Sequence, residues 1–233
     1  MNSLYYYYWR FVVPLVTRMT ARGPSGQAKS VWIDVGAHMG ESTLREAVRR
    51  RECIVYAFEP NIKAVSGAFA LLDNYIVVPM AVTESDGFTE IHLNSEDVAS
   101  SILPLDEEGL KKWKSRRPLR NVATAIVPVI RLDSFMRQMH ISCVDYLKID
   151  AQGGDLAVLR SAGDRIRDIK EVCMEVQITD VPIYVGAPTK DEVLEFMTGK
   201  GFTLVQTTRQ SFDQEENLLF RRFDWIQAHT EVT

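Results

Sequence analysis

The sequence predicts an α/β fold in which helices flank a mostly parallel central sheet. Short apolar runs at residues 31–35 and 54–58 each precede a segment with helical periodicity, at 41–51 and 61–72. The pattern returns after an apolar run at 144–149, which leads into a glycine turn. Strands that alternate with helices in this way form parallel sheets covered on both faces.

The remaining segments complete the sheet and add an insertion. We expect strands at 75–78 and 171–176, helices from Asp155 onward and at 190–200, and a closing antiparallel strand pair at 202–206 and 218–223. The region 88–132 is expected to be a β-rich insertion. Its elements are a strand at 88–93, a loop at 98–103, a short helix at 105–114 and a strand at 125–132, with a helix at 133–139 after it.

The composition is that of an ordinary globular protein. The 233 residues are 46% hydrophobic and 25% charged, which is enough for one substantial core. The net charge of −4 argues against a nucleic-acid partner, and the basic residues at 111–120 are expected to form a solvated face. Three cysteines without a Cys-x-x-Cys spacing indicate reduced thiols and a cytoplasmic protein.

The N-terminal segment stands apart from the rest of the chain. Residues 1–29 hold a run of aromatic side chains followed by a glycine- and proline-containing linker at 20–29, so we place the folded domain at 30–233. Aromatic residues favour packing on the domain or forming a lid, and they could also contact a membrane surface. No run in the chain approaches the ~20 apolar residues of a transmembrane helix.

A glycine turn follows the first predicted strand. Asp34 lies near the end of this strand, and Gly36 and Gly40 bracket the turn that leads into a helix. Apolar strand, glycine turn and helix start are typical of a site for an adenosine-containing cofactor, because glycine lets the backbone approach its ligand. Glu59 ends the second strand, where a carboxylate can accept hydrogen bonds from both ribose hydroxyls.

Acidic residues recur at or near the ends of four predicted strands. They are Asp34, Glu59, Asp150 and Glu175. Ligands of open α/β sheets bind at this carboxyl edge, so the recurrence predicts one shared site.

Two cofactor classes are compatible with such an edge. A nicotinamide-dependent Rossmann reductase would carry Gly-x-Gly-x-x-Gly and usually a Tyr-x-x-x-Lys pair, and the chain has neither. Its Asp-x-Gly-x-x-x-Gly turn, together with Glu59 and the turn after Asp150, favours S-adenosylmethionine.

The chain resembles the FkbM family of S-adenosylmethionine-dependent methyltransferases. The motifs that carry the resemblance are IDVGAHMGEST at 33–43, YAFEPN at 56–61, PMAV at 79–82, RLDSF at 131–135 and YLKIDAQGGDLAVLRSA at 146–162. The resemblance implies a Rossmann-like class I fold and, commonly, O-methylation of sugars, glycolipids, polyketides or other natural products. The acceptor would then be a hydroxyl of a small molecule or glycan.

The motifs and the resemblance together give a set of expected cofactor contacts. These are Asp34, Gly36, Ala37, His38, Gly40, Glu41, Glu59, Pro60, Asn61, Ala81, Ser101 and Asp150. Two positions depart from the family pattern, because Gln152 replaces a usual glutamate and Gly154-Asp155 replaces alanine-glutamate. The loss of that charge leaves open a second function, a cofactor-binding module with impaired catalysis.

Four side chains are candidates for the chemistry of methyl transfer. A base that takes the hydroxyl proton adds a factor of about 10²–10⁴. Lys148 could be this base if burial lowers its pKa, and His38 could transfer a proton near neutral pH. Asp150 and Glu175 could orient the acceptor; the alternatives are a turn cap and a salt bridge. Both could also bind Mg²⁺, but further ligands are not evident and we predict no metal.

Overall fold

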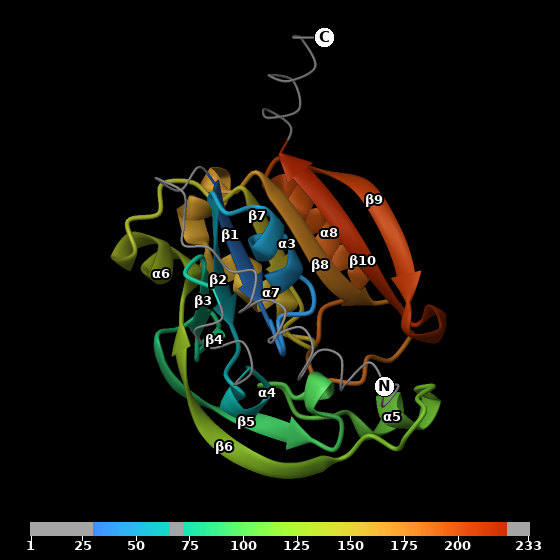
Figure 1. Cartoon of the computed structure of the whole chain (residues 1–233). Coiled ribbons are helices and arrows are strands. Elements are labelled where there is room, and N and C mark those ends of the chain that lie inside the picture. Colours follow the sequence, from blue (N-terminus) through green and yellow to red (C-terminus); the bar gives the residue numbers. More distant parts are fainter. Residues whose placement is uncertain (1–29, 66–71, 223–233) are drawn as a thin grey trace.

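The computed structural model describes residues 30–65 and 72–222 (Figure 1). The aromatic N-terminal segment and most of the helix expected at 61–72 lie outside the described residues. Of that helix, α4 (Ile62–Val65) is seen.

A seven-stranded sheet forms the centre of the protein. Its strands are β1 (Ser30–Val35), β2 (Cys53–Phe58), β3 (Tyr75–Val78), β7 (Tyr146–Ile149), β8 (Glu171–Gln177), β9 (Phe202–Gln210) and β10 (Glu215–Arg222). They are arranged in the order β3-β2-β1-β7-β8-β10-β9. β1 pairs in parallel with β2 on one side and with β7 on the other. The first strands of the chain therefore extend the sheet on one side of β1, and the later strands extend it on the other side. Such a switch point creates a crevice for a ligand at the carboxyl ends of the strands.

The two ends of the sheet confirm the expected topology. β2 and β3 are parallel, as are β7 and β8. β10 is antiparallel to both β8 and β9, which gives the predicted antiparallel pair at the C-terminal side. The fold is therefore Rossmann-like, with a mostly parallel sheet.

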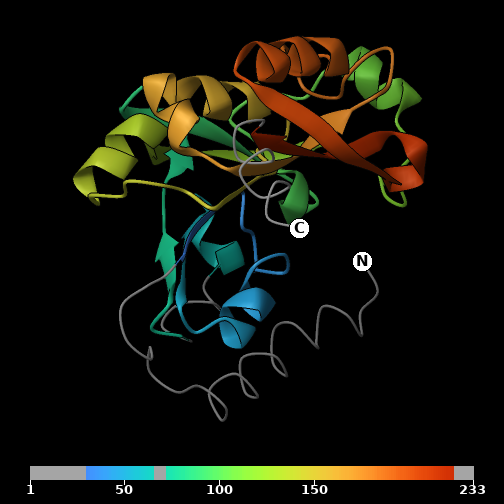
Figure 2. The same ribbon diagram turned by 90° about the horizontal axis from the view of Figure 1, so that it is seen from above.

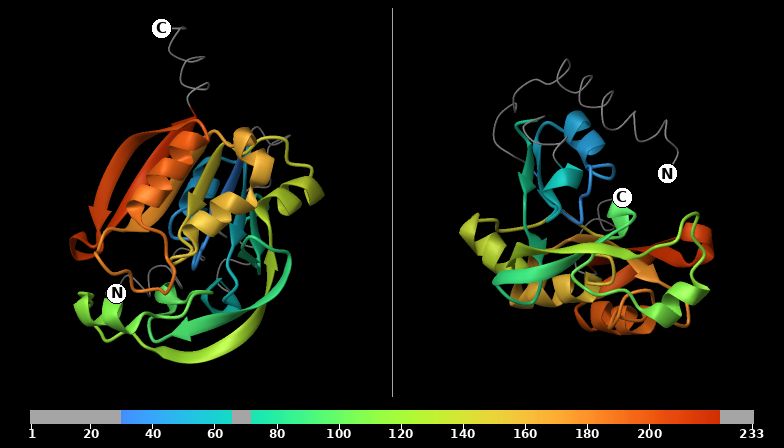
Figure 3. Two further views of the ribbon diagram at one scale, coloured as in Figure 1. Left: turned by 180° about the vertical axis from the view of Figure 1, so that it is seen from behind. Right: turned by 90° about the horizontal axis from the view of Figure 1, so that it is seen from below.

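Helices cover both faces of this sheet. On one face, α3 (Leu44–Arg49) buries Leu44 and Ala47. The views from behind and from above place α7 (Asp155–Ser161) and α8 (Lys190–Gly199) on the opposite face (Figures 2 and 3). α6 (Leu132–Gln138) and the 3₁₀ helix η4 (Gly163–Asp168) lie beside α7.

The predicted insertion is a small, separate sheet. It contains β4 (Ala81–Val82), β5 (Gly87–Asn94) and β6 (Asn121–Ile130), with β6 in the middle. The long β5–β6 ribbon curves below the carboxyl ends of the central strands (Figure 1). Between β5 and β6 the chain forms the 3₁₀ helix η3 (Asp97–Ala99) and α5 (Glu107–Lys112). The insertion thus provides a second wall opposite the carboxyl edge of the main sheet.

Several boundaries differ from those expected. The helix predicted at 41–51 begins only at Leu44, because the glycine turn continues through residues 38–43 and places His38 at a φ of +48°. The loop expected at 98–103 includes the end of η3 and a β-bridge between Ser101 and His92. β6 and β9 are longer than predicted, because their added residues are mostly exposed and lack an apolar pattern. β10 begins earlier than predicted, at Glu215, because the two buried residues that start it are charged and not apolar.

Candidate active site

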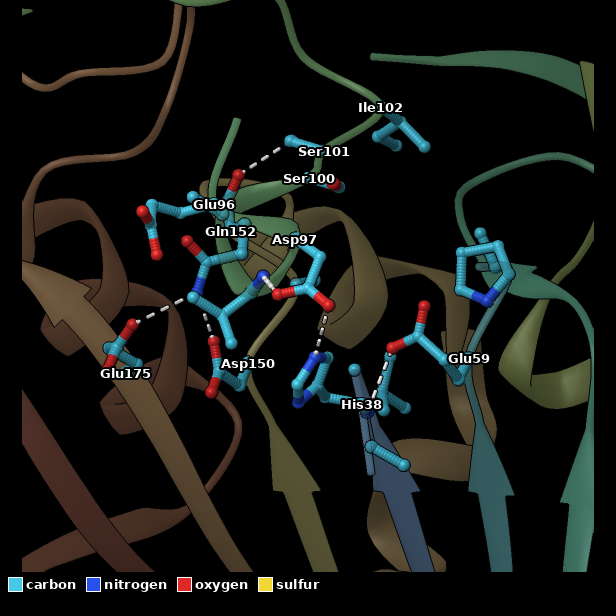
Figure 4. A pocket seen from close by; sticks show the side chains of 18 of the residues that line it. His38, Glu59, Glu96, Asp97, Ser100, Ser101, Ile102, Asp150, Gln152 and Glu175 are labelled. Atoms are coloured by element: carbon cyan, nitrogen blue, oxygen red, sulfur yellow. Dashed lines mark hydrogen bonds and ion pairs between the residues drawn. The ribbon is translucent and has the colours of Figure 1, made fainter. Parts of the chain in front are cut away.

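A cavity of about 500 Å³ lies between the carboxyl edge of the central sheet and the insertion (Figure 4). Its size falls in the range of small-molecule sites. The ends of β1, β2 and β7 form one wall, and η3 with the residues after it forms another. The switch point between β1 and β7 therefore opens into this cavity, as the topology requires.

Residues 36–43 form the turn after β1 at which the sequence predicts the cofactor, and we call it the cofactor turn. Gly36 begins this turn and has a structural reason to be glycine. Its φ is +75°, and a Cβ built on it would lie 1.8 Å from the backbone oxygen of Asp150. Its amide and that of Ala37 both donate to the carbonyl of Phe58, at 3.0 and 2.9 Å. The glycine thus lets the ends of β1, β2 and β7 approach one another and keeps the turn open toward the cavity.

Glu59 holds this turn in place from the end of β2. Its two carboxylate oxygens accept the backbone N–H groups of His38 at 2.9 Å and Asn61 at 2.8 Å. Burial raises the pKa of Glu59, while these two N–H donors oppose the rise. Each oxygen keeps a second lone pair, and the side chain lines the cavity, so Glu59 can still accept ribose hydroxyls.

His38 connects the turn to the insertion. Its Nδ1 lies 2.8 Å from Glu41 Oε1, and its Nε2 lies 3.4 Å from Asp97 Oδ2 on η3 (Figure 4). Burial alone would lower the pKa of His38, but the contacts with Asp97 and Glu41 raise it to about 10. His38 is therefore an imidazolium at neutral pH. The expectation that it transfers a proton near neutrality does not fit this environment.

Lys148 is likewise held as a cation. Its Nζ lies 3.4 Å from Asp34 Oδ1, 3.4 Å from Asp150 Oδ2 and 3.3 Å from the carbonyl oxygen of Gly36. Burial opposes the charge, but the surrounding carboxylates, led by Asp34, raise the pKa of Lys148 well above its ordinary value. A base would need the opposite shift. Lys148 instead clamps the ends of β1 and β7 together.

Gln152 is the centre of a hydrogen-bond network after β7. Its Nε2 donates to Asp150 Oδ1 at 2.6 Å and to Glu175 Oε2 at 3.4 Å. Its Oε1 lies 2.7 Å from the Tyr184 hydroxyl, and its backbone oxygen accepts the Ser101 hydroxyl at 2.7 Å. A neutral amide can bond two carboxylates and a hydroxyl at once, which a glutamate here could not do without protonation.

The third wall of the cavity is acidic. Asp150, Glu175 and Glu215 line it together. Glu175 accepts the side-chain amide of Gln210, and burial, with the nearby Asp150 charge, raises the pKa of Glu175 well above its ordinary value. Like charges in a buried space favour the retention of a proton among them.

The structure brings most of the predicted site residues to one cavity. Those that line it are Gly36, Ala37, His38, Glu41, Glu59, Pro60, Ala81, Ser101, Lys148, Asp150 and Glu175. Three predicted residues do not line it: Asp34, Gly40 and Asn61. Asp34 is fully buried behind the wall, where Oδ2 accepts the Thr43 hydroxyl at 2.5 Å and Oδ1 faces Lys148.

Three further residues of the site were not predicted from the sequence. Asp97 begins η3 and Tyr184 lies in a loop, and neither segment carries a motif; Glu215 begins the strand beyond β8. Nothing in their sequence context marked the first two. Glu215 follows the pattern of acids at strand ends only in space, because its strand runs antiparallel and it stands at the start instead.

The described residues contain no group of three or more His, Cys, Asp or Glu side chains arranged to hold a metal ion. Cys53, Cys143 and Cys173 are free thiols. No helix among residues 30–65 and 72–222 is long and apolar enough to cross a membrane.

The fold and the cavity define a Rossmann-like protein with a site for an adenosine-containing cofactor. The open glycine turn, the Glu59 carboxylate beside it and the space beyond them fit such a group. The family model described as the methyltransferase FkbM domain matches residues 34–204. The chain belongs to this family of methyltransferases, and S-adenosylmethionine is accordingly its cofactor.

Solved structures of similar fold share little sequence with the chain. Precorrin-6y C5,15-methyltransferase from Geobacter metallireducens is 12% identical, with a TM-score of 0.42 over 91% of this chain and 86% of that one. TrmK from M. capricolum, solved with S-adenosyl-homocysteine, is 11% identical, with a TM-score of 0.44 over 91% and 68%. A putative type 11 methyltransferase from Sulfolobus solfataricus is 12% identical, with a TM-score of 0.41 over 83% and 84%. No curated protein sequence matches the chain.

Proposed function

We propose that the protein transfers a methyl group from S-adenosylmethionine to a hydroxyl oxygen of a small molecule or glycan. The single observation that supports an oxygen acceptor is the acidic wall formed by Asp150, Glu175 and Glu215 beside the cofactor turn. Carboxylates accept hydrogen bonds from hydroxyls, and a buried carboxylate can take the proton that a hydroxyl must lose.

The proposed cofactor contacts follow from the cavity wall. Gly36 and Ala37 offer the open turn, and Glu59 offers free lone pairs to the ribose hydroxyls. When bound, S-adenosylmethionine supplies an electrophilic methyl group on its sulfonium sulfur. His38 joins the turn to Asp97 of the insertion, so the two walls of the cavity are connected on this side.

The acidic wall would position the acceptor. Asp150 is fixed by Lys148 on one oxygen and by Gln152 on the other, so its direction is set before any ligand binds. Preorganised groups of this kind lower the entropic cost of aligning acceptor oxygen, methyl carbon and sulfur. In this arrangement Lys148 orients Asp150 and does not itself take a proton.

The proposal is tested in two steps. Calorimetry with S-adenosylmethionine and S-adenosylhomocysteine should give one site per chain, and no heat with folded protein would refute the function. A panel of methyl glycosides, phenols and aliphatic alcohols, with a parallel panel of amines, then identifies the acceptor by mass spectrometry. Transfer to amines alone would overturn the oxygen assignment. Tight cofactor binding without transfer to either panel would favour the impaired binding module.

A further inference from the structure

Glu215 occupies a position that no motif of the chain points to. It is the first residue of β10, is only 6% exposed and lies on the cavity wall. In the register of β8 and β10, Glu215 is opposite Gln177, and Asn217 is opposite Glu175. Residues two apart on a strand share a face, so Glu215 and Glu175 are diagonal neighbours on the same face of the sheet.

The three carboxylates of the acidic wall differ in their partners. Asp150 contacts the Lys148 ammonium and the Gln152 amide. Glu175 is bonded by the amides of Gln152 and Gln210. Glu215 has only neutral partners, the Ser211 hydroxyl and the Gln177 side chain, and no salt bridge to it exists among the described residues. Of the three carboxylates, Glu215 is therefore the one whose charge is least used in holding the structure together.

The turn that precedes Glu215 has a strained backbone. Ser211, Phe212 and Asp213, which form the 3₁₀ element η5 (Ser211–Asp213), have φ values of 52°, 60° and 62°. This left-handed region is rare for a residue with a bulky side chain, and strained backbone persists where the surroundings fix it, often at functional sites.

Gln214 is the residue that fixes this turn. Its Oε1 accepts the backbone N–H of Lys114 at 2.6 Å, and its Nε2 donates to the carbonyl oxygens of Lys114 and Ser211, both at 2.9 Å. The turn is thereby attached to the segment after α5, whose Trp113 and Ser115 also line the cavity. As a result, Ser211 and Glu215 are held against the cavity at the β10 end of the sheet.

We propose that Glu215 is the general base of the methyl transfer. This inference rests on the proposed function. The acceptor O–H proton moves to the Glu215 carboxylate as the acceptor oxygen bonds to the methyl carbon; the carbon–sulfur bond breaks and its electron pair stays on sulfur, which becomes a neutral thioether. The proton leaves Glu215 for solvent after the product departs.

The electrostatics of the wall suit this role. Burial raises the pKa of Glu215 above its ordinary value of 4.5, and the Asp150 charge adds to the rise, whereas hydrogen bonds from Ser211 and Gln177 oppose it. A base is most effective when its pKa approaches the working pH. Two buried groups, Asp155 and Tyr184, lie close to the acidic wall. The other titratable or charged groups that line the cavity are His38, Glu41, Glu59, Glu96, Asp97, Arg117, Lys148, Asp150 and Glu175.

A titration that needs no acceptor tests the ionisation of Glu215. The protein is labelled with ¹³C at the glutamate carboxyl carbons, saturated with S-adenosylhomocysteine and titrated by NMR, with Glu215 assigned by comparison with Glu215→Gln. We expect a midpoint above 4.5. A midpoint at or below 4.5 would overturn the inference.

Kinetics with the acceptor found in the hydroxyl panel test the role itself. Glu215→Gln should lower kcat by about 10²–10⁴-fold, with the Kd for S-adenosylhomocysteine within about twofold of the wild type. The acidic limb of the kcat–pH profile should disappear, and Glu215→Asp should recover part of the rate. Glu171→Gln, which removes a half-buried charge paired with Arg221 on the same two strands and away from the cavity lining, is the matched control.

The methyltransferase activity and the role of Glu215 are tested by different outcomes. Wild-type protein that binds no cofactor, or methylates nothing in the panel, refutes the proposed function, whereas the NMR midpoint still decides the ionisation of Glu215. A wild-type enzyme that is active while Glu215→Gln keeps a kcat within tenfold refutes the inference alone.

Discussion

The ammonium of Lys148 lies 3.4 Å from a carboxylate oxygen of Asp34, directly behind the cavity wall. Asp34 is fully buried, and the Lys148 side chain is 13% exposed. This ion pair joins the two central strands at the switch point of the sheet: Asp34 lies behind the cavity wall, and Lys148 forms part of that wall.

Replacing Lys148 by methionine should destabilise the protein by roughly 3–5 kcal/mol, because the buried Asp34 charge would lose its counter-ion. Urea unfolding followed by circular dichroism measures the change. Lys111→Met is the control, since Lys111 pairs with Glu108 on the surface and such pairs contribute at most about 1 kcal/mol. Equal unfolding midpoints for Lys148→Met and the wild type would contradict the structural role of the pair.

Gly36→Ala should abolish the cofactor turn. The new Cβ would lie 1.8 Å from the Asp150 carbonyl oxygen at a φ of +75°, so strands β1 and β7 would have to separate. We expect a loss of roughly 2–5 kcal/mol in unfolding free energy and no detectable binding of S-adenosylhomocysteine by calorimetry.

Gly199→Ala is the matched control for this change. A Cβ at Gly199 meets nothing within 4 Å at the end of α8, so stability should stay the same or rise by up to about 1 kcal/mol. If Gly36→Ala binds the cofactor as tightly as Gly199→Ala does, the close approach of the three strand ends is not required.

The contacts of His38 predict a pH dependence of stability. Its pKa is about 10 in the folded protein against an ordinary value of 6.5, so the folded state binds the proton more tightly than the unfolded one. The resulting stabilisation is present in full below about pH 6.5 and is lost as the pH rises through about 10.

His38→Asn isolates this effect, because asparagine tolerates the left-handed backbone of residue 38 and does not titrate. Between pH 7 and 10, the free energy of unfolding of this variant, measured with urea, should fall less than that of the wild type, because the contribution of His38 is missing. In a variant that keeps His38, the single substitution Asp97→Asn should lower the pH midpoint at which His38 loses its proton, as measured by NMR titration. A His38 midpoint near 6.5 would show that the contact with Asp97 does not form.

Tyr184→Phe should loosen the turn at Gln152. The Tyr184 hydroxyl lies 2.7 Å from Gln152 Oε1 and 2.9 Å from the Ala99 carbonyl oxygen, so it ties the turn after β7 to the insertion. Its loss removes the one O–H donor that these two acceptors share and should cost about 1–3 kcal/mol, with weaker cofactor binding. Tyr56→Phe removes a hydroxyl that does not bond to this turn, and it should leave calorimetric affinity unchanged. Wild-type affinity in Tyr184→Phe would argue against the link.

Much of the site is encoded locally and could be predicted from the sequence. Strand periodicity places Asp34, Glu59 and Asp150 at the carboxyl edge, because parallel strands end together. The glycine turn at Gly36 is marked by its composition. The family motifs lie in these same elements, so local pattern and resemblance agree on the cofactor side of the cavity.

Only the tertiary structure decides what the remaining charges do. The ionisation of Lys148 depends on three carboxylates that different strands bring together. The ionisation of His38 depends on Asp97, which lies 59 residues further along the chain. Glu215 reaches the cavity because an antiparallel strand returns its first residue to the edge where the parallel strands end. Sequence period fixes which face of a strand a residue occupies, whereas electrostatic energy depends on distances between segments that only folding brings together.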